Sequence, residues 1–327
     1  MAQKNLGKAR KGKNDEFYTQ LTDIEKELKH YKAQFKNKVV LCNCDDPRVS
    51  NFFHYFFHNF EVLGLKKLIT TCYKNDNSNI FTQNTSEKAV YLEYTGDKNG
   101  NRVPDPEEIG IKNFKGDGDF RSKESIELLK QADIVCTNPP FSLFREYVAQ
   151  LMKYKKKFLI IGNMNAITYK EIFPLIKANK LWAGYGFNQS FVFQTTYENN
   201  LEANRKFCEQ KGYFGKNYIK TPAVNWYTNL EVAKRKEEIT LYKTYTPQEY
   251  PKYDNYDAIE VAKVVDIPMD YDGVMGVPIT FLDKHNPDQF ELLGSNRGVD
   301  QDPNSIYGKG SYIGGKETYK RLFIRKK

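Results

Sequence analysis

Residues 133–141 read Asp-Ile-Val-Cys-Thr-Asn-Pro-Pro-Phe. The apolar run that begins this segment has the length and composition of a buried β-strand. Both prolines after Asn138 lack a backbone N–H and fix φ, so the strand must end there and the loop must be stiff. In open α/β sheets the carboxyl ends of the strands form the ligand-binding edge. We therefore expect the Asn138 side chain and the carbonyl next to it to point out from that edge.

This loop offers a specific set of chemical groups. The Asn138 side chain and the neighbouring carbonyl are two hydrogen-bond acceptors at a fixed spacing, with Phe141 as an aromatic plate beside them. Two such acceptors suit the two hydrogens of an exocyclic amino group on a planar ring. They localise the nitrogen lone pair, which can then attack an electrophilic methyl carbon. The alternative is a simple turn in which Asn138 caps the following helix.

The composition is that of a globular chain with one large domain, or one domain plus a smaller one. The chain has 327 residues, of which 40% are hydrophobic. No run approaches the roughly 18 apolar residues of a membrane span. The first 15 residues contain no apolar segment of the kind found in secretory signals. Five cysteines, an odd number without zinc-site spacing, favour a reducing compartment. These features predict a cytoplasmic protein with no membrane segment and no metal site.

The charge is strongly positive and unevenly distributed. A formal net charge of +9 and a pI near 9.0 indicate a polyanionic partner. Basic residues gather at both ends of the chain, at Lys4, Lys8, Arg10, Lys11 and Lys13 and at Lys316, Lys320, Arg321, Arg325, Lys326 and Lys327. Such ends are often only solvated tails, but 14% of the residues are aromatic and provide stacking surfaces beside the charge. Nucleic acid is the predicted partner.

Strands and helices alternate through the first half of the chain. Strands are predicted at 38–43, 67–72, 133–137 and 157–162, and residues 114–120 as a short strand that runs into an acidic loop. A hairpin is predicted at 90–100, and helices at 24–35, 48–60, 122–130, 142–154 and 168–179. This alternation predicts an α/β protein with a doubly wound, mostly parallel sheet. After about residue 183 the alternation stops. We therefore divide the chain into a basic N-terminal arm at 1–13, an α/β domain at 14–183 and a less regular α+β region at 184–327.

Two acidic loops follow strands of the predicted sheet. Asp45 lies just after the first strand, and residues 116–120 read Gly-Asp-Gly-Asp-Phe. Carboxylates there can accept hydrogen bonds from a ribose or an adenine amino group, and Phe120 can stack on a purine. Each aspartate alone is equally well explained as a turn residue. Their placement at successive strand ends favours an adenosine-like ligand.

Several of these segments together resemble the EcoRI-type adenine-N6 DNA methyltransferase family. They are DEFYT at 15–19, NCDDPRVSNFF at 43–53, GDGDF at 116–120, NPPF at 138–141, PKYDNYDAI at 251–259 and GVMGVPITFL at 273–282. The resemblance covers most of residues 13–182 and resumes over about 250–300. It implies the fold of class I S-adenosylmethionine-dependent methyltransferases, S-adenosyl-L-methionine as methyl donor and adenine in double-stranded DNA as acceptor.

The resemblance also implies roles for individual residues. In the catalytic loop, Asn138 and the Pro139 carbonyl accept the adenine N6 hydrogens, Pro140 stiffens the loop and Phe141 stacks on a flipped base. The donor-binding residues implied are Tyr18, Thr19, Asn43, Asp45, Asp119 and Phe120. Residues 184–327 become a target-recognition region. The family further implies a monomer, a restriction endonuclease as functional counterpart and a palindromic target similar to GAATTC.

The sequence departs from the common methyltransferase pattern at two donor contacts. The glycine-rich loop usual after the first strand is replaced by Asn43-Cys44-Asp45-Asp46-Pro47, and the carboxylate expected after the second strand is missing at Cys72-Tyr73. Other acceptors remain open, because cytosine N4, RNA adenine and a protein glutamine present a similar nitrogen to such a loop. A non-catalytic DNA-binding protein of the same fold is the alternative from another functional class.

Overall fold

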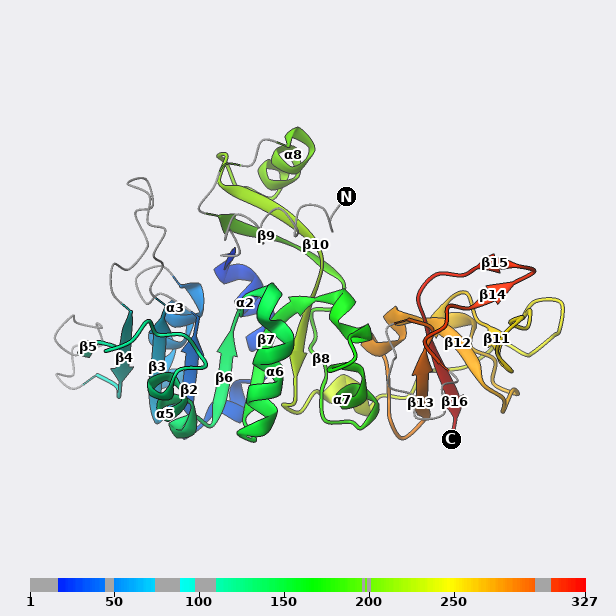
Figure 1. Ribbon diagram of the computed structural model, residues 1–327, viewed down its shortest axis with the longest axis horizontal. Coiled ribbons are helices and arrows are strands. Elements are labelled where there is room, and N and C mark those ends of the chain that lie inside the picture. Colours follow the sequence, from blue (N-terminus) through cyan, green and yellow to red (C-terminus); the bar gives the residue numbers. More distant parts are fainter. Residues whose placement is uncertain are drawn as a thin grey trace. The chain divides into compact units, whose positions relative to one another are not determined.

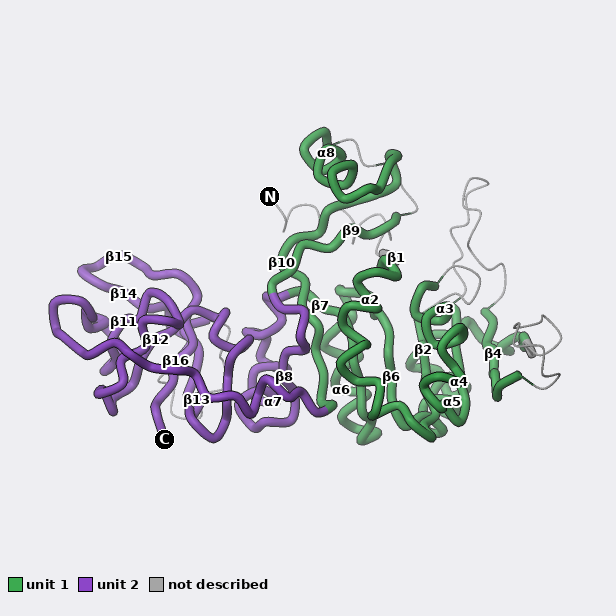
Figure 2. Tube along the Cα trace, turned by 180° about the vertical axis from the view of Figure 1, so that it is seen from behind, with its two compact units in different colours: residues 1–163, 188–230 green, residues 164–187, 231–327 purple. Residues whose placement is uncertain are grey.

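The computed structural model describes residues 17–44, 50–73, 89–97, 110–195, 198, 201–297 and 307–327. The predicted basic arm at 1–13 and the donor-binding candidate Asp45 lie outside the described residues. The chain forms two compact units, one of residues 1–163 and 188–230 and the other of residues 164–187 and 231–327 (Figure 2). The boundary predicted near residue 183 thus lies within the first segment of the second unit, and residues 188–230 return to the first.

A single mixed sheet organises the first unit (Figure 1). Its strands are β1 (Phe17–Thr19), β2 (Val39–Asn43), β3 (Lys67–Cys72), β4 (Val90–Tyr94), β5 (Gly110–Asn113), β6 (Ile134–Thr137), β7 (Lys157–Asn163), β9 (Gln189–Thr195) and β10 (Tyr218–Thr228). They are ordered β1-β9-β10-β7-β6-β2-β3-β4-β5. The four central strands, β7, β6, β2 and β3, run parallel. Every residue of β2 and β6 is buried, as expected for parallel strands covered on both faces.

The prediction of a mostly parallel sheet is correct for these central strands and wrong at both edges. On one side β4 and β5 are antiparallel to their neighbours, but β5 lies at 110–113 and not within the hairpin predicted at 90–100. Residues 114–120, predicted to begin with a strand, follow β5 without forming one. On the other side β10, β9 and β1 follow β7 in antiparallel order. Antiparallel neighbours need no crossover helix. The helix-strand alternation that revealed the centre therefore carried no signal for these edges.

Helices cover both faces of the sheet. They are α2 (Leu21–Leu28), α3 (Asn51–His58), α4 (Phe60–Leu63), α5 (Lys123–Gln131), α6 (Phe144–Lys153) and α8 (Glu202–Gln210). Trp226 and Tyr227 are consecutive in β10, so their side chains point to opposite faces. The Trp226 ring lies 5.9 Å from that of Phe52 in α3, and the Tyr227 ring lies 5.1 Å from that of Phe144 in α6. Helices α3 and α6 therefore lie on opposite sides of the sheet.

The second unit contains a smaller sheet of the order β11-β12-β16-β13. The helices and strands of this unit are α7 (Phe173–Lys177), β8 (Trp182–Ala183), β11 (Ile259–Glu260), β12 (Met275–Pro278), β13 (Phe290–Ser295), β14 (Tyr312–Ile313), β15 (Lys316–Glu317) and β16 (Arg321–Lys326). Strand β16 lies between β12 and β13 and pairs antiparallel with both. The basic end of the chain is thus largely a central strand, so the alternative of a solvated tail is wrong there.

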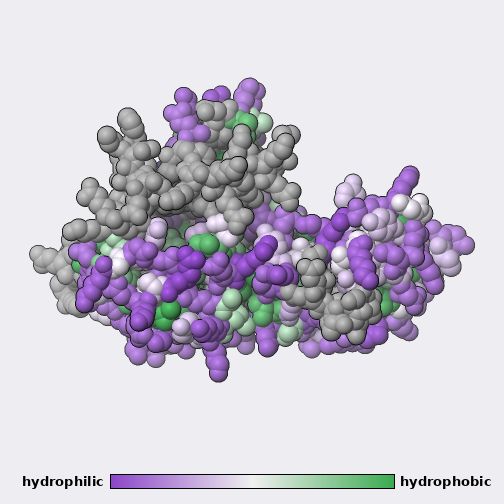
Figure 3. Space-filling view, viewed as in Figure 1, coloured by the Kyte–Doolittle hydropathy of each residue, from purple (hydrophilic) through white to green (hydrophobic). Residues whose placement is uncertain are grey.

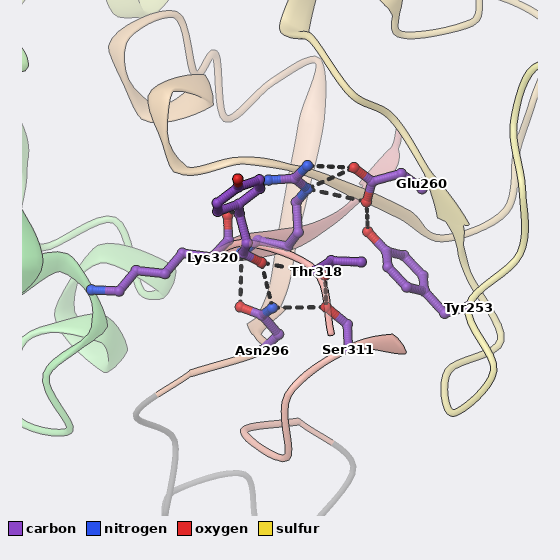
Figure 4. Close-up of polar contacts among 8 residues, drawn as sticks. Tyr253, Glu260, Asn296, Ser311, Thr318 and Lys320 are labelled. Atoms are coloured by element: carbon purple, nitrogen blue, oxygen red, sulfur yellow. Dashed lines mark hydrogen bonds and ion pairs between the residues drawn. The ribbon is translucent and has the colours of Figure 1, made fainter. Parts of the chain in front are cut away.

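A buried ion pair joins β16 to β11 (Figure 4). The Arg321 guanidinium donates to both carboxylate oxygens of Glu260, from Nε at 2.9 and 3.0 Å and also from Nη2. The Tyr253 hydroxyl donates to the same carboxylate, and burial together with this contact raises the pKa of Tyr253. Asn296 accepts from the Arg321 backbone N–H at 2.7 Å and donates to Ser311 at 2.7 Å. Each of the two buried charges therefore has partners.

We expect Arg321→Met to destabilise the protein by about 3–5 kcal/mol, because it leaves the buried Glu260 carboxylate uncompensated. Arg325→Met is the matched control. Arg325 lies four residues along the same strand and pairs with Glu291 at 2.8 Å, but both side chains are nearly half exposed. Its loss should cost less than about 1 kcal/mol. Urea unfolding followed by circular dichroism measures both changes, and equal losses would contradict this account of the buried pair.

Candidate active site at the carboxyl edge of the sheet

The loop at 138–141 leaves the sheet at the carboxyl end of β6, as predicted. Strand β6 ends at Thr137, and a short 3₁₀ turn begins at Phe141. The backbone N–H of Leu143 donates to the Pro140 carbonyl at 3.0 Å, and α6 starts at the next residue. Pro140 precedes the turn and Leu143 precedes the helix, so Asn138 occupies neither N-cap position. The alternative of Asn138 as a helix cap is therefore wrong.

Asn43 joins the ends of β2 and β6 to helix α6. Its backbone carbonyl accepts a hydrogen bond from the Thr137 hydroxyl, and its side-chain oxygen accepts one from the Tyr147 hydroxyl. All three residues are buried. The structure therefore places Asn43 at the predicted edge, directly beside the strand that leads into Asn138, with its side-chain oxygen directed to Tyr147.

The acidic loop is held against the end of β3. Gly118 has a φ of +76°, and a Cβ at this position would lie 2.8 Å from both the Cys72 carbonyl oxygen and the Ala89 side chain. Asp117 accepts a hydrogen bond from the Asp119 N–H at 3.0 Å, which tightens the turn. Only glycine combines this backbone conformation with so close an approach. The second glycine of the Gly-Asp-Gly-Asp-Phe motif thus fixes the loop at the carboxyl edge.

Asp119 lies in a chain of ion pairs. Arg121 donates to both of its carboxylate oxygens, at 2.9 Å from Nε and 2.7 Å from Nη2, and also to Glu146 of α6 at 2.9 Å. The Arg121 contacts hold the pKa of the Asp119 carboxyl below its usual value. Phe120 is buried between the Arg121 guanidinium, 5.2 Å from its ring, and the Tyr147 ring at 5.1 Å. Asp119 is therefore an ionised hydrogen-bond acceptor beside an aromatic cluster.

Strand β1 brings the N-terminal motif to the same edge. Thr19 pairs in register with Phe193 of β9, and the Phe193 ring lies 6.4 Å from that of Phe141. The Thr19 carbonyl accepts from the Asn51 side chain at 2.7 Å, which ties β1 to the start of α3. Tyr18 is in β1, but its side chain lies outside the described part of the structure. Motifs far apart in the sequence thus meet around the loop at 138–141.

The Thr19 hydroxyl is a buried polar group at this edge. Its Oγ1 atom is buried, and it has no hydrogen-bond partner within the described residues. A buried hydroxyl is usually satisfied by protein or by a bound molecule. The residues present therefore fit a ligand with polar groups near β1. Within the described residues, no group of three or more His, Cys, Asp or Glu side chains could hold a metal ion.

Two residues of the site were missed in the sequence. Arg121 directly follows the Gly-Asp-Gly-Asp-Phe motif and looked like an ordinary surface arginine. Tyr147 falls at helical spacing with the buried Phe144, Val148 and Leu151, so it looked like a core residue. Its burial was foreseeable from that spacing, but its hydrogen bond to Asn43 was not, because the two residues are 104 positions apart.

In the described part of the chain, no helix is long and apolar enough to span a membrane.

Nearly the whole chain is similar to known proteins of one family. Residues 5–327 match the family described as "Adenine-specific methyltransferase EcoRI". Type II methyltransferase M.EcoRI of Escherichia coli is 52% identical over 316 residues, which cover 95% of this chain and 94% of that protein. M.MgeORF184P of Mycoplasma genitalium is 41% identical over 88% of this chain and 85% of its own. M.MpnI of Mycoplasma pneumoniae is 38% identical over 98% of each. No solved structure matches the chain significantly.

We expect Gly118→Ala to destabilise the protein more than Gly212→Ala. Both glycines have positive φ, so both substitutions strain the backbone, but a Cβ at Gly212 meets no atom within 4 Å. The clash with Cys72 and Ala89 should add about 1–3 kcal/mol at Gly118. Thermal unfolding of the two variants measures the difference. A loss at Gly118 no larger than that at Gly212 would show that the acidic loop is not fixed by this contact.

Proposed function

Because this chain belongs to the EcoRI family of adenine-specific DNA methyltransferases, we propose that the edge around Asn138 is the site of its methyl transfer. The enzyme class follows from the family. The roles of individual residues are our proposal, and one observation carries it. The Asn138 loop, the acidic loop and strand β1 lie at the carboxyl edge of one mixed α/β sheet, linked through Thr137, Asn43, Tyr147 and the pair Phe141–Phe193. This sheet is consistent with the class I methyltransferase fold.

We propose that S-adenosyl-L-methionine lies across the ends of β1, β2 and the acidic loop. When bound, it supplies a methyl group on a positively charged sulfur. Asp119, kept ionised by Arg121, would accept from the adenine amino group of the donor, and Phe120 would border its ring. Tyr18 and Thr19 would meet the methionine end, where the buried Thr19 hydroxyl needs a partner. Asn43 would shape the floor of the site, and Asp45 remains a proposed contact from the sequence.

The acceptor is held by the loop at 138–141. Asn138 Oδ1 and the Pro139 carbonyl accept the two N6 hydrogens of an adenine that has left the duplex, Pro140 keeps the spacing, and the half-buried Phe141 stacks on the base. The N6 lone pair is normally delocalised into the ring, and accepting both hydrogens draws it toward a tetrahedral geometry. The nitrogen then forms a bond to the methyl carbon as the carbon–sulfur bond breaks. One N6 proton departs afterwards to water, because neither acceptor is a base.

The chain needs no covalent nucleophile or metal ion for this transfer. The donor is already activated, so the protein contributes orientation and electrostatic stabilisation. Cytosine N4, RNA adenine and glutamine amides have comparable nitrogens, and the family favours adenine in DNA over them. A non-catalytic DNA-binding role is disfavoured because the loops at 116–120 and 138–141 are both intact.

Double-stranded DNA is the macromolecular partner that we propose. The net charge of +9 allows phosphate contacts that offset the few kcal/mol needed to unstack a base. We further propose that the enzyme acts as a monomer in the cytoplasm, that it protects DNA against a restriction endonuclease of the same specificity, and that residues 184–327 read the target. A GAATTC-like palindrome is the first target to test.

The decisive experiment is transfer of a labelled methyl group from S-adenosylmethionine to a duplex containing GAATTC. Random-sequence duplex DNA, RNA and a protein mixture serve as parallel acceptors, and DNA products are digested to nucleosides. Label in N6-methyladenine supports the proposal. Label in N4-methylcytosine or only in RNA or protein contradicts the proposed acceptor, and absence of label in all four acceptors contradicts the proposed activity.

We expect Asn138→Ala to lower the rate of methyl transfer by about a hundredfold to a thousandfold, the usual effect of removing one preorganised group that stabilises a transition state. Donor and DNA affinities should change little. Asn59→Ala is the matched control. Asn59 follows α3 at the amino edge of the same sheet and donates to the Tyr55 carbonyl at 2.8 Å. Single-turnover rates and donor titrations compare the variants. A loss of donor affinity in Asn138→Ala as large as its loss of rate would contradict the proposed role.

A further inference from the structure

An excursion of the first unit rises beyond the catalytic edge. Strand β10 pairs with β7 only as far as Val224, opposite Asn163 at the carboxyl end of β7. Its outer half, Tyr218–Thr221, pairs with β9. Helix α8 and residues 211–217 connect the far ends of β9 and β10 (Figure 1). The excursion therefore projects past the edge that carries Asn138.

A bulge in β10 marks the start of this excursion. The register between β9 and β10 shifts between Thr221 and Val224, and Ala223 has a φ of +58°. Bulges bend a strand, increase its twist and are common beside active sites. Pro222, within the bulge, cannot donate to a ladder of hydrogen bonds. The outer half of the hairpin thus leaves the plane of the main sheet at a fixed point next to the site.

The loop after α8 carries an exposed aromatic ring. Phe214 is 75% exposed, which is unusual for so large an apolar side chain. It lies between Gly212 and Gly215, both of which have positive φ. Lys211 directly precedes Gly212, and Lys216 directly follows Gly215. Figure 3 shows hydrophobic atoms among hydrophilic ones over α8. An exposed ring with lysines on both sides matches a partner that has stacked planar groups inside and negative charges outside.

The charge of the excursion supports the same partner. Residues 201–220 contain five basic and two acidic side chains. Lys220 lies 4.0 Å from the Phe207 ring, and the Tyr213 and Tyr218 rings lie 5.5 Å apart. Tyrosine, phenylalanine and lysine so arranged form a positive surface with stacking groups, as found where proteins follow a nucleic-acid backbone.

The reach of the loop fits the proposed chemistry. Ile219 pairs with Phe193, whose ring contacts Phe141. Phe214 is five residues from Ile219, so the chain places it within about 18 Å of that position. This is comparable to the width of a duplex whose base has moved to Asn138. The bound therefore allows the ring to lie at the base stack while the extruded base occupies the loop at 138–141.

We propose that Phe214 enters the base stack of duplex DNA at the position that the target adenine leaves, while Lys211 and Lys216 contact the flanking phosphates. This inference rests on the proposed function. Apolar side chains that insert between bases stabilise unstacked DNA. Phe214 therefore favours the extruded state and does not touch the reacting atoms. Its effect should disappear when the adenine is already unpaired.

The test compares Phe214→Ala with the wild-type protein on two duplexes. One is fully paired at the methylated site, and in the other an abasic position faces the target adenine. We expect Phe214→Ala to lower the single-turnover rate on the paired duplex roughly tenfold to a hundredfold, as for loss of one base-stacking contact. The rate on the abasic duplex should remain near that of the wild type. With 2-aminopurine at the target position, the fluorescence increase on binding should shrink in the variant.

Two further variants make the result specific. Phe214→Trp retains a stacking ring and should keep most of the rate. Val62→Ala removes a side chain that is 79% exposed on α4, at a different part of the same unit, and should have no effect. An unchanged rate in Phe214→Ala on the paired duplex, or an equal loss on both duplexes, would overturn the inference. If the wild-type protein methylates no DNA, the proposed function fails, which is a different outcome from either of these.

Discussion

The contacts of Asn43 are the constraint on which the candidate site depends. This one buried residue accepts a hydrogen bond from Thr137 through its backbone and another from Tyr147 through its side chain. Strand β2, strand β6 and helix α6 are thereby fixed at the same level. Buried polar atoms are costly when they lack partners, so a displacement of any of the three elements would expose that cost. The loop at 138–141 connects β6 to α6, so its position is set by these two elements.

The two sides of the proposed site are stiffened by different means. On the acceptor side, Pro139 and Pro140 restrict the backbone, so the loop loses little entropy when a base binds. On the donor side, Gly118 allows the acidic loop to approach the end of β3, and Arg121 connects Asp119 to α6. Tyr147 belongs to both sides, because its hydroxyl contacts Asn43 and its ring contacts Phe120. Tyr147 is therefore a structural link between the two sides.

The sequence predicted the centre of this structure better than its edges. Parallel strands buried on both faces are continuous apolar runs, and the loops at 116–120 and 138–141 are distinctive, so the carboxyl edge could be located. The return of residues 188–230 to the first unit could not be predicted, because antiparallel strands pair without a crossover helix and the sequence does not show which sheet they join. Arg321 was misjudged for a related reason. Its charge suggested the surface, while its buried partner Glu260 is 61 residues away.

The segment at 188–230 would allow one sheet to serve both the small donor and the large acceptor that we propose. The parallel centre ends in short, stiff loops, which suit a ligand the size of a nucleoside. A duplex is much wider, and binding it needs surface beyond that edge. Strands β9 and β10 continue past β7 after the bulge at Thr221–Val224, and we propose that they supply this surface. Phe193 of β9 contacts Phe141, so the excursion and the loop at 138–141 share a common support. A duplex bound there, as we propose, would be held in a defined position relative to Asn138.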